Sequence, residues 1–213
     1  MVEGEGDDSD LMNPVLLTAA GNPENQDRGI ILVDDLRAVL CVADGAGGRS
    51  GGMEAAAMAM EFIRHGVTSL HSAESCVALL RAMDEAVSKD AMAGETTCVL
   101  VVVTGETVFG ASVGDSGAWI IPEAGAHLDL TRGQQRKPFV GTSIANPVSF
   151  NYPKPEALLL LATDGLLKYA AAECIISVCR EQMLESAPQR LVGLVRYPSG
   201  SLPDDVTVIL AKV

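Results

Sequence analysis

Four aspartates of this chain stand at the ends of apolar runs. Asp44 follows the run LCVA and Asp164 follows LLLLAT, and each is followed by glycine. Asp27 and Asp204 stand just before other apolar runs. Such runs are typical of buried β-strands, so we expect each carboxylate at the edge of a strand. Carboxylates that converge from several strands form the kind of site that hard divalent cations occupy.

Convergence of these carboxylates requires bound cations. Two like charges about 4 Å apart repel by about 4 kcal/mol at an effective dielectric near 20. Two divalent ions would offset this repulsion, and ions about 3.5–4 Å apart can activate a shared water as a nucleophile. Aspartate and backbone carbonyl oxygens select Mg²⁺ or Mn²⁺ over zinc, and Gly45 has a carbonyl that no side chain shields. Taken singly, each Asp-Gly pair is better explained as a turn, so only the joint pattern favours a site.

The composition limits the classes of protein to which the chain can belong. Its 213 residues, 48% of them hydrophobic, fit a single domain, which we assign to residues 11–213 behind an acidic tail at residues 1–10. No apolar run reaches the roughly 18 residues of a membrane span, and no signal peptide opens the chain, so a cytoplasmic protein is expected. The net charge of −13 argues against nucleic-acid binding. The five cysteines form no Cys-x-x-Cys pair and are expected to be reduced thiols.

The expected elements are strands joined mainly as hairpins, with helices between them. Strands are predicted at 15–20, 29–33, 38–43, 96–103, 107–113, 118–121, 158–162 and 206–211. Helices are predicted at 53–66, at 72–89 with Ser72 as N-cap, around 172–183, and in a short segment that Pro188 opens. The lack of steady strand–helix alternation favours a layered α+β fold over a doubly wound parallel sheet.

Six short motifs follow one another along nearly the whole domain. They are Asn25-Gln26-Asp27, Val42-Ala43-Asp44-Gly45-Ala46-Gly47-Gly48, Gly94-Glu95-Thr96-Thr97, Val113-Gly114-Asp115-Ser116, Ala162-Thr163-Asp164-Gly165-Leu166 and Asp204-Asp205-Val206-Thr207. In this order and spacing the chain resembles the metal-dependent protein Ser/Thr phosphatases of type 2C (the PPM family). The Asp-Gly-x-Gly-Gly form at Asp44 is typical of the bacterial branch, so the chain is similar to a small bacterial-type member.

The resemblance implies a fold and an activity. The fold would be a four-layer α-β-β-α sandwich of two antiparallel sheets flanked by helices. The activity would be hydrolysis of phosphoserine or phosphothreonine in proteins by a hydroxide that two Mg²⁺ or Mn²⁺ ions activate, without a phosphoenzyme. The implied partner is a phosphorylated protein, such as a stress-signalling regulator, and neither a nucleic acid nor a membrane.

The resemblance also implies a role for each residue of the metal site. By the family's pattern Asp44 bridges both ions, and the Gly45 carbonyl binds one of them. Asp164 and Asp204 hold the other ion. Asp27 belongs to the same site and accepts hydrogen bonds from metal-bound water.

The chain departs from the family at positions close to the substrate. Asn22 stands where the family has its phosphate-binding arginine, and Gln26 replaces a glutamate of the metals' outer shell. Arg28, Arg49 and Arg132 are therefore the candidates for holding the phosphate, with a solvated surface arginine as the alternative for each. These changes leave a second interpretation open, in which the chain is a catalytically weakened or inactive module that binds a phosphoprotein partner in bacterial signalling.

Two further predictions concern the rim of the site. Asp90 lies near the position at which the family holds a third ion. The segment between Ser116 and Ala162 is short for the family, so a reduced flap is expected over the site, with Thr131-Arg132 and Gly141 as its remnants.

Overall fold

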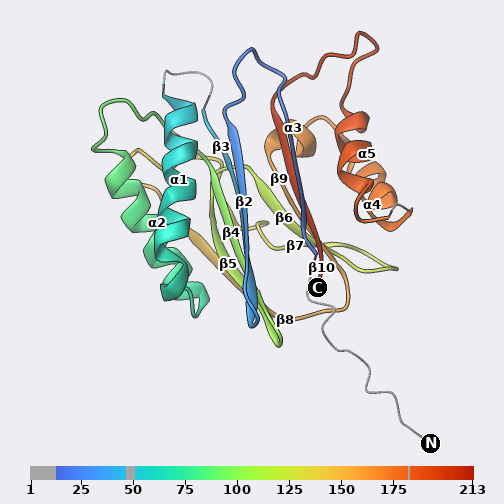
Figure 1. Ribbon diagram of the computed structural model, residues 1–213, viewed down its shortest axis with the longest axis horizontal. Helices are drawn as coiled ribbons and strands as arrows, with labels where there is room; N and C mark the ends of the chain where they lie inside the picture. The colour runs from blue at the N-terminus through green and yellow to red at the C-terminus, as the bar shows by residue number, and fades with distance from the viewer. Residues whose placement is uncertain (1–12, 47–50, 182) are drawn as a thin grey trace, which may run out of the picture.

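The computed structural model describes residues 13–46, 51–181 and 183–213. Its strands form two five-stranded sheets: sheet A has the order β1-β10-β9-β6-β7, and sheet B has the order β2-β3-β4-β5-β8. The elements follow one another as β1 (Val15–Ala19), β2 (Asp27–Val33), β3 (Arg37–Asp44), α1 (Gly52–Gly66), the 3-10 turn η1 (Val67–Ser69), α2 (Ala73–Val87), β4 (Cys98–Thr104), β5 (Thr107–Val113), β6 (Gly117–Ile121), β7 (Leu128–Asp129), β8 (Val148–Pro153), β9 (Leu158–Ala162), α3 (Asp164–Leu167), α4 (Ala172–Glu181), α5 (Ala187–Leu194) and β10 (Val206–Lys212). Helices α1 and α2 lie on one side of the paired sheets, and α3, α4 and α5 lie on the other (Figure 1). The predicted acidic tail at residues 1–10 falls outside the described residues.

Three apolar cores separate the four layers and explain why the strands are apolar throughout. Alternate side chains of a strand point to opposite faces of its sheet. In β3, Leu40 and Val42 pack between the two sheets, whereas Cys41 belongs to the core beneath α1 and α2. In β9, Leu161 packs between the sheets, and Leu160 belongs to the core beneath α4 and α5. Both faces of each sheet are therefore covered, and the predicted α-β-β-α sandwich is confirmed.

The predicted strands and helices are present, with ends shifted by no more than two residues, but β7, β8 and α3 are absent from the prediction. Strand β8 lies at the edge of sheet B, and Phe150 is its one fully buried residue, so its polar sequence VSFNYP gives a weak strand signal. Helix α3 is a single turn that begins at Asp164. Ser72 does cap α2, because its hydroxyl accepts the Ser75 amide at 3.3 Å while the Ser75 hydroxyl accepts the Ser72 amide at 3.0 Å.

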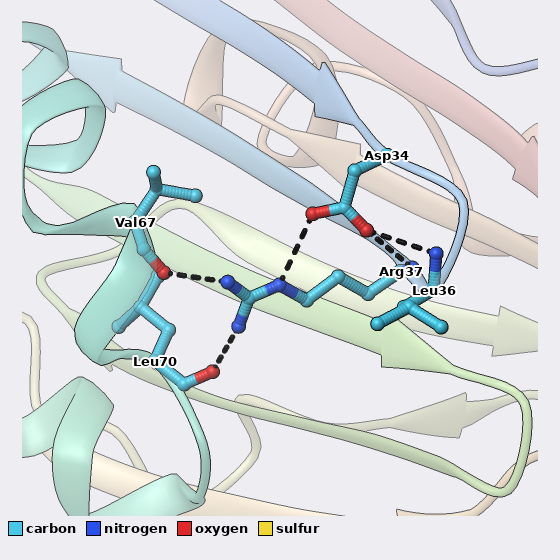
Figure 2. A network of polar contacts seen from close by, with 5 residues as sticks. All are labelled: Asp34, Leu36, Arg37, Val67 and Leu70. Carbon is cyan, nitrogen blue, oxygen red and sulfur yellow. Dashed lines mark hydrogen bonds and ion pairs between the residues drawn. The ribbon is translucent and has the colours of Figure 1, made fainter.

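The turn between β2 and β3 is fastened to the segment that follows α1. The Asp34 carboxylate accepts the backbone amides of Leu36 at 2.9 Å and Arg37 at 3.0 Å. The Arg37 guanidinium reaches in the other direction and donates to the carbonyl oxygens of Val67, at 3.0 Å, and Leu70 (Figure 2). This network anchors one end of the β2–β3 hairpin, and the candidate site lies at the other end of the same two strands.

Two findings bear on the predicted class of protein. In the three described ranges, none of the helices combines the length and the apolar character that crossing a bilayer requires. All five cysteines are free, and Cys174 alone is exposed. The thiol sulfurs of Cys41 and Cys98 lie 3.5 Å apart inside the core beneath α1 and α2.

Candidate metal and phosphate site

Sheet B brings the first two aspartates together by strand register. Asp27 begins β2, Asp44 ends β3, and the two residues are directly opposite each other in the antiparallel ladder. Opposite residues of such a ladder point to the same face with Cβ atoms about 4.5–5.5 Å apart, where like charges are destabilising. Asp27 is 1% exposed, so its carboxylate has almost no contact with solvent. The arrangement is one that a neutralising cation or a proton has to stabilise.

Sheet A delivers the other two predicted aspartates. Asp164 opens α3 just after β9, and Asp204 comes shortly before β10, the neighbour of β9 in the sheet. The Thr163 amide donates to the Thr207 carbonyl at 3.0 Å and so keeps these two strand ends side by side. Asp44, Asp164 and Asp204 all line one cleft of about 600 Å³.

Burial and neighbouring charges raise the pKa of three of these aspartates, Asp27, Asp44 and Asp164. Burial, and after it the charges of Asp27, Asp164 and Asp204, raise the pKa of Asp44 to about 10. Burial raises the pKa of Asp27 to about 7, although hydrogen bonds from Thr163 and Thr207 act in the opposite direction. Burial, followed by the charge of Asp115, raises the pKa of Asp164.

Two of the sequence motifs serve to hold the backbone of Asp44. The Asp44 carbonyl accepts the Thr97 amide at 2.8 Å and the Thr96 hydroxyl at 2.9 Å. The Asp44 amide donates to the Thr97 hydroxyl at 3.0 Å, and that hydroxyl lies 2.7 Å from the hydroxyl of Ser116. Because Thr96, Thr97 and Ser116 are all buried, the end of β3 is held in place from two directions.

The last two acidic residues of the sequence, Asp204 and Asp205, have different environments. The Asp205 carboxylate accepts the amides of Gly21 at 2.8 Å, Asn22 at 3.1 Å and Gln26 at 2.8 Å, so it fixes the loop between β1 and β2. The Asp204 carboxylate instead accepts the side-chain amide of Asn22 at 3.2 Å. Asn22, at the position where the family has its arginine, therefore contacts an acidic residue of the site.

Close packing explains the glycine of each Asp-Gly pair. A Cβ atom on Gly45 would lie 2.3 Å from the Gly52 carbonyl oxygen at the start of α1. A Cβ atom on Gly165 would lie 1.9 Å from the Asp205 carbonyl oxygen. Gly45 was predicted because its carbonyl could approach a metal, and the structure adds a steric reason for glycine at this position. Gly45 also lines the cleft.

The donor set fits a hard divalent cation. Asp27 Oδ1 and Gln26 Oε1 are buried oxygen atoms with no hydrogen-bond partner, and the cleft adds the carboxylates of Asp44, Asp164 and Asp204. Oxygen ligands of this kind suit Mg²⁺ and Mn²⁺. In the described part of the chain, no three acidic, histidine or cysteine side chains are already gathered closely enough to hold an ion.

Of the three arginines predicted to hold the phosphate, the two that the structure describes lie outside the cleft. Arg28 donates to the carbonyl oxygens of Asn25 at 2.8 Å and Asp27 at 2.7 Å and does not line the cleft, so its guanidinium supports the backbone instead. Arg132 is exposed and is likewise not among the lining residues. Arg49 falls outside the described residues.

Asp90, the residue predicted to hold a third ion, also lies apart from the cleft. Its carboxylate accepts the amides of Met92 at 2.8 Å and Ala93 at 3.1 Å and so stabilises the turn after α2. Asp115 lines the cleft instead, and its charge acts on Asp164.

Among the described residues, the cations that line the cleft are Arg136, Lys137 and Lys168, and sequence reasoning missed all three. We call these three residues the basic edge. Arg136 Nε lies 2.6 Å from Asp115 Oδ2. The available signal was the Arg-Lys pair in the shortened flap segment, the only adjacent basic pair in the sequence.

Comparisons with known proteins agree with this geometry. The layers and strand order are those of a two-sheet sandwich, and a family model for protein phosphatase 2C matches residues 19–186. The chain belongs to the protein phosphatase 2C family. Comparison with curated protein sequences gives no match.

Solved structures of bacterial phosphatases share the fold at low sequence identity. The serine/threonine phosphatase Stp1 from Staphylococcus aureus superposes with a TM-score of 0.83 at 20% identity, covering 100% of this chain and 99% of its own. A bacterial serine phosphatase gives 0.82 at 21% identity, covering 95% of this chain and 98% of its own. The catalytic domain of PstP, in complex with 2 manganese ions, gives 0.76 at 17% identity, with coverage of 95% and 98%.

Proposed function

We propose that this chain is a Mg²⁺- or Mn²⁺-dependent phosphatase that hydrolyses phosphoserine and phosphothreonine in proteins. The observation that carries the proposal is the meeting of Asp44, Asp164 and Asp204 in one cleft, with Asp27 opposite Asp44 on the neighbouring strand. Neighbouring carboxylates that are partly shielded from solvent, as these are, retain their charge more readily when cations lie beside them. The manganese ions of the PstP relative support the same chemistry.

The residues that would hold two ions are Asp44, Asp164 and Asp204, together with the Gly45 carbonyl and Asp27. When bound, the ions supply an activated water and offset the negative charge that develops on the phosphate oxygens. Asp90, the residue predicted to hold a third ion, would not hold one from its position on the turn after α2, because it does not line the cleft.

The chain's own groups prepare the site before substrate arrives. The Thr163 hydroxyl donates to Asp27 Oδ2 at 2.8 Å, which leaves Oδ1 free to face an ion or its water. The contacts from Thr96 and Thr97 fix the carbonyl of Asp44. Because these donors are buried and already paired, little reordering of the backbone has to accompany binding.

The decisive experiment is metal-dependent hydrolysis of p-nitrophenyl phosphate and of a phosphothreonine peptide. Wild-type protein should be active with Mn²⁺ and inactive with a chelator, and Asp164→Asn should lose at least about a hundredfold in kcat. Asp90→Asn is the matched control, because it removes an exposed carboxylate outside the cleft and should retain full activity. A wild-type protein that is inert with both Mn²⁺ and Mg²⁺ would rule out the proposal.

Calorimetric titration with Mn²⁺ separates the enzyme from the inactive module. Binding of two ions together with hydrolysis supports the enzyme, whereas one weak site or none without hydrolysis supports a module that only binds a phosphoprotein. A stress-signalling regulator as the substrate, and a cytoplasmic location, remain predictions from the sequence.

A further inference from the structure

The substrate phosphate needs a cation, and this chain has none at the position of the family's phosphate-binding arginine. That position is Asn22, whose side chain donates to Asp204 and carries no charge. In a chain with a net charge of −13, the cleft nevertheless gathers the three cations of the basic edge. Arg136 is the one whose side chain directly contacts a carboxylate of the cleft.

We propose that the Arg136 guanidinium is the phosphate clamp of this chain, held by Asp115 in the empty protein and transferred to the phosphate of the substrate. The inference rests on the proposed function and names the residue that replaces the missing arginine at Asn22. Arginine suits this task because its planar fork can bind two phosphate oxygens at once.

The ion pair between Arg136 and Asp115 is close but easily exchanged. It has a single Nε–Oδ2 contact at 2.6 Å, and the Arg136 side chain is 68% exposed against 24% for Asp115. Pairs this exposed contribute little to stability because water competes for both partners. A phosphate that carries two negative charges offers Arg136 a stronger partner than one carboxylate, so transfer is favourable once substrate enters the cleft.

Hydrogen bonds hold the segment that carries Arg136 in place on both sides. On one side, Gln134 accepts a hydrogen bond from Ser112 at 3.1 Å. On the other, Val140 and Thr96 exchange two backbone hydrogen bonds of 3.0 Å each. Arg136 therefore extends from a short stretch between two fixed points, so little backbone freedom is lost when its side chain binds the phosphate.

A buried carboxylate adds further hydrogen bonds just after Val140. Asp84, 4% exposed on α2, accepts the amides of Gly141 at 2.7 Å, Thr142 at 3.0 Å and Ser143 at 3.0 Å on one oxygen. Its other oxygen accepts the Ala145 amide at 2.9 Å. The shortened flap is thus tied to the α1–α2 layer, which keeps the preceding residues at the cleft.

The other two residues of the basic edge support the same assignment. The Lys137 ammonium lies 5.2 Å from the centre of the Phe139 ring, and the Lys168 ammonium lies 5.0 Å from that of Tyr169. Both lysines line the cleft as point charges, without the paired geometry of a guanidinium. They raise the local concentration of anions, whereas Arg136 fixes the orientation of the phosphate.

The test is calorimetric titration of inorganic phosphate into the Mn²⁺-loaded full chain, after Mn²⁺ binding has been verified for each variant. Arg136→Ala should weaken phosphate binding by about tenfold or more, and Arg136→Lys should recover part of the loss. Arg132→Ala is the matched control, because it removes an exposed arginine of the same loop outside the cleft and should bind phosphate as wild type does. For a phosphopeptide, KM should rise by a similar factor in Arg136→Ala.

Asp115→Asn distinguishes a clamp from a residue that only positions Asp115. This variant keeps the guanidinium and removes its competitor, so phosphate binding should be retained or strengthened. Loss of binding equal to that of Arg136→Ala would overturn the clamp, as would an Arg136→Ala protein that binds phosphate like wild type. If the protein hydrolyses phosphoesters but Arg136→Ala binds phosphate like wild type, the clamp is refuted and the proposed function stands. If phosphate binding depends on Arg136 but no hydrolysis is detected, the clamp stands and the proposed function is refuted.

Discussion

Replacing Thr163 by valine tests whether its buried hydroxyl organises the candidate site. The Thr163 side chain is fully buried, donates to Asp27 Oδ2 at 2.8 Å and accepts the Thr207 amide at 2.9 Å. Valine has nearly the same shape without the hydroxyl, so both hydrogen bonds disappear while the packing is retained. The Thr207 amide is left without this partner, at a cost of about 1–3 kcal/mol, and loss of one of the two hydrogen bonds to Asp27 adds about 1 kcal/mol. We therefore expect Thr163→Val to lower the free energy of unfolding by about 2–4 kcal/mol.

Urea denaturation without metal at neutral pH measures this loss. Thr163→Ser is the matched control, because it keeps the hydroxyl and loses one methyl group, which should cost about 1 kcal/mol. The same variants should differ in Mn²⁺ affinity. The Thr163 hydrogen bond lowers the pKa of Asp27, so its loss makes Asp27 retain its proton more strongly against the metal. If the valine variant is as stable as the serine variant and binds Mn²⁺ equally well, the hydroxyl does not organise the site.

Three further outcomes follow from the structure. Asp84→Ala removes the acceptor of four backbone amides and should destabilise the chain by about 2–4 kcal/mol, with faster hydrogen exchange at residues 141–145 as the local readout. Arg37→Ala frees two backbone carbonyls at η1 and should lower stability by about 1–2 kcal/mol, which thermal unfolding measures against a Leu36→Ala control at an 82% exposed side chain. The pKa values of Asp27 (about 7) and Asp44 (about 10) lie above the ordinary aspartate value of 3.8. At pH values between the ordinary and the raised pKa, the metal-free native state therefore binds more protons than the unfolded state. Its stability should therefore fall as pH rises from 5 to 8, by up to about 1.4 kcal/mol per pH unit for each such proton, while the gain from added Mn²⁺ should grow; a flat profile in denaturation without metal would contradict this sign.

The fold was largely predictable because its strands are buried on both faces. Runs such as Cys98–Thr104 and Val206–Lys212 are apolar along almost their whole length, so their existence and their approximate ends follow from hydrophobicity alone. Strand β8 was not predictable in this way, since only Phe150 of its six residues is buried and its partner lies 36 or more residues earlier in the chain. Edge pairing of this kind depends on tertiary contacts that local patterns do not encode.

The aspartates could be predicted and the cations could not, for a physical reason. Asp44 and Asp164 stand at the ends of strands, and strand ends within one sandwich have few alternative positions. Arg28 stands next to Asp27 in the sequence, yet its long side chain turns back onto the backbone. Arg136 lies outside all the aspartate motifs in the sequence, and it reaches Asp115 only because the loop that carries it folds back to the cleft. The sequence pattern does not specify the path of that loop.

The cross-strand pair of Asp27 and Asp44 shows how the fold tolerates its own site. Directly opposed carboxylates destabilise an antiparallel ladder, and here burial adds to the repulsion. The ladder survives because the same strands supply alternating side chains to two apolar cores, and because Thr97 and Thr163 hold the two residues from outside the pair. Because a cation has to displace the protons that these raised pKa values favour, metal affinity in this chain should increase with pH and with each hydrogen bond that lowers the pKa of a carboxylate, such as that from Thr163 to Asp27.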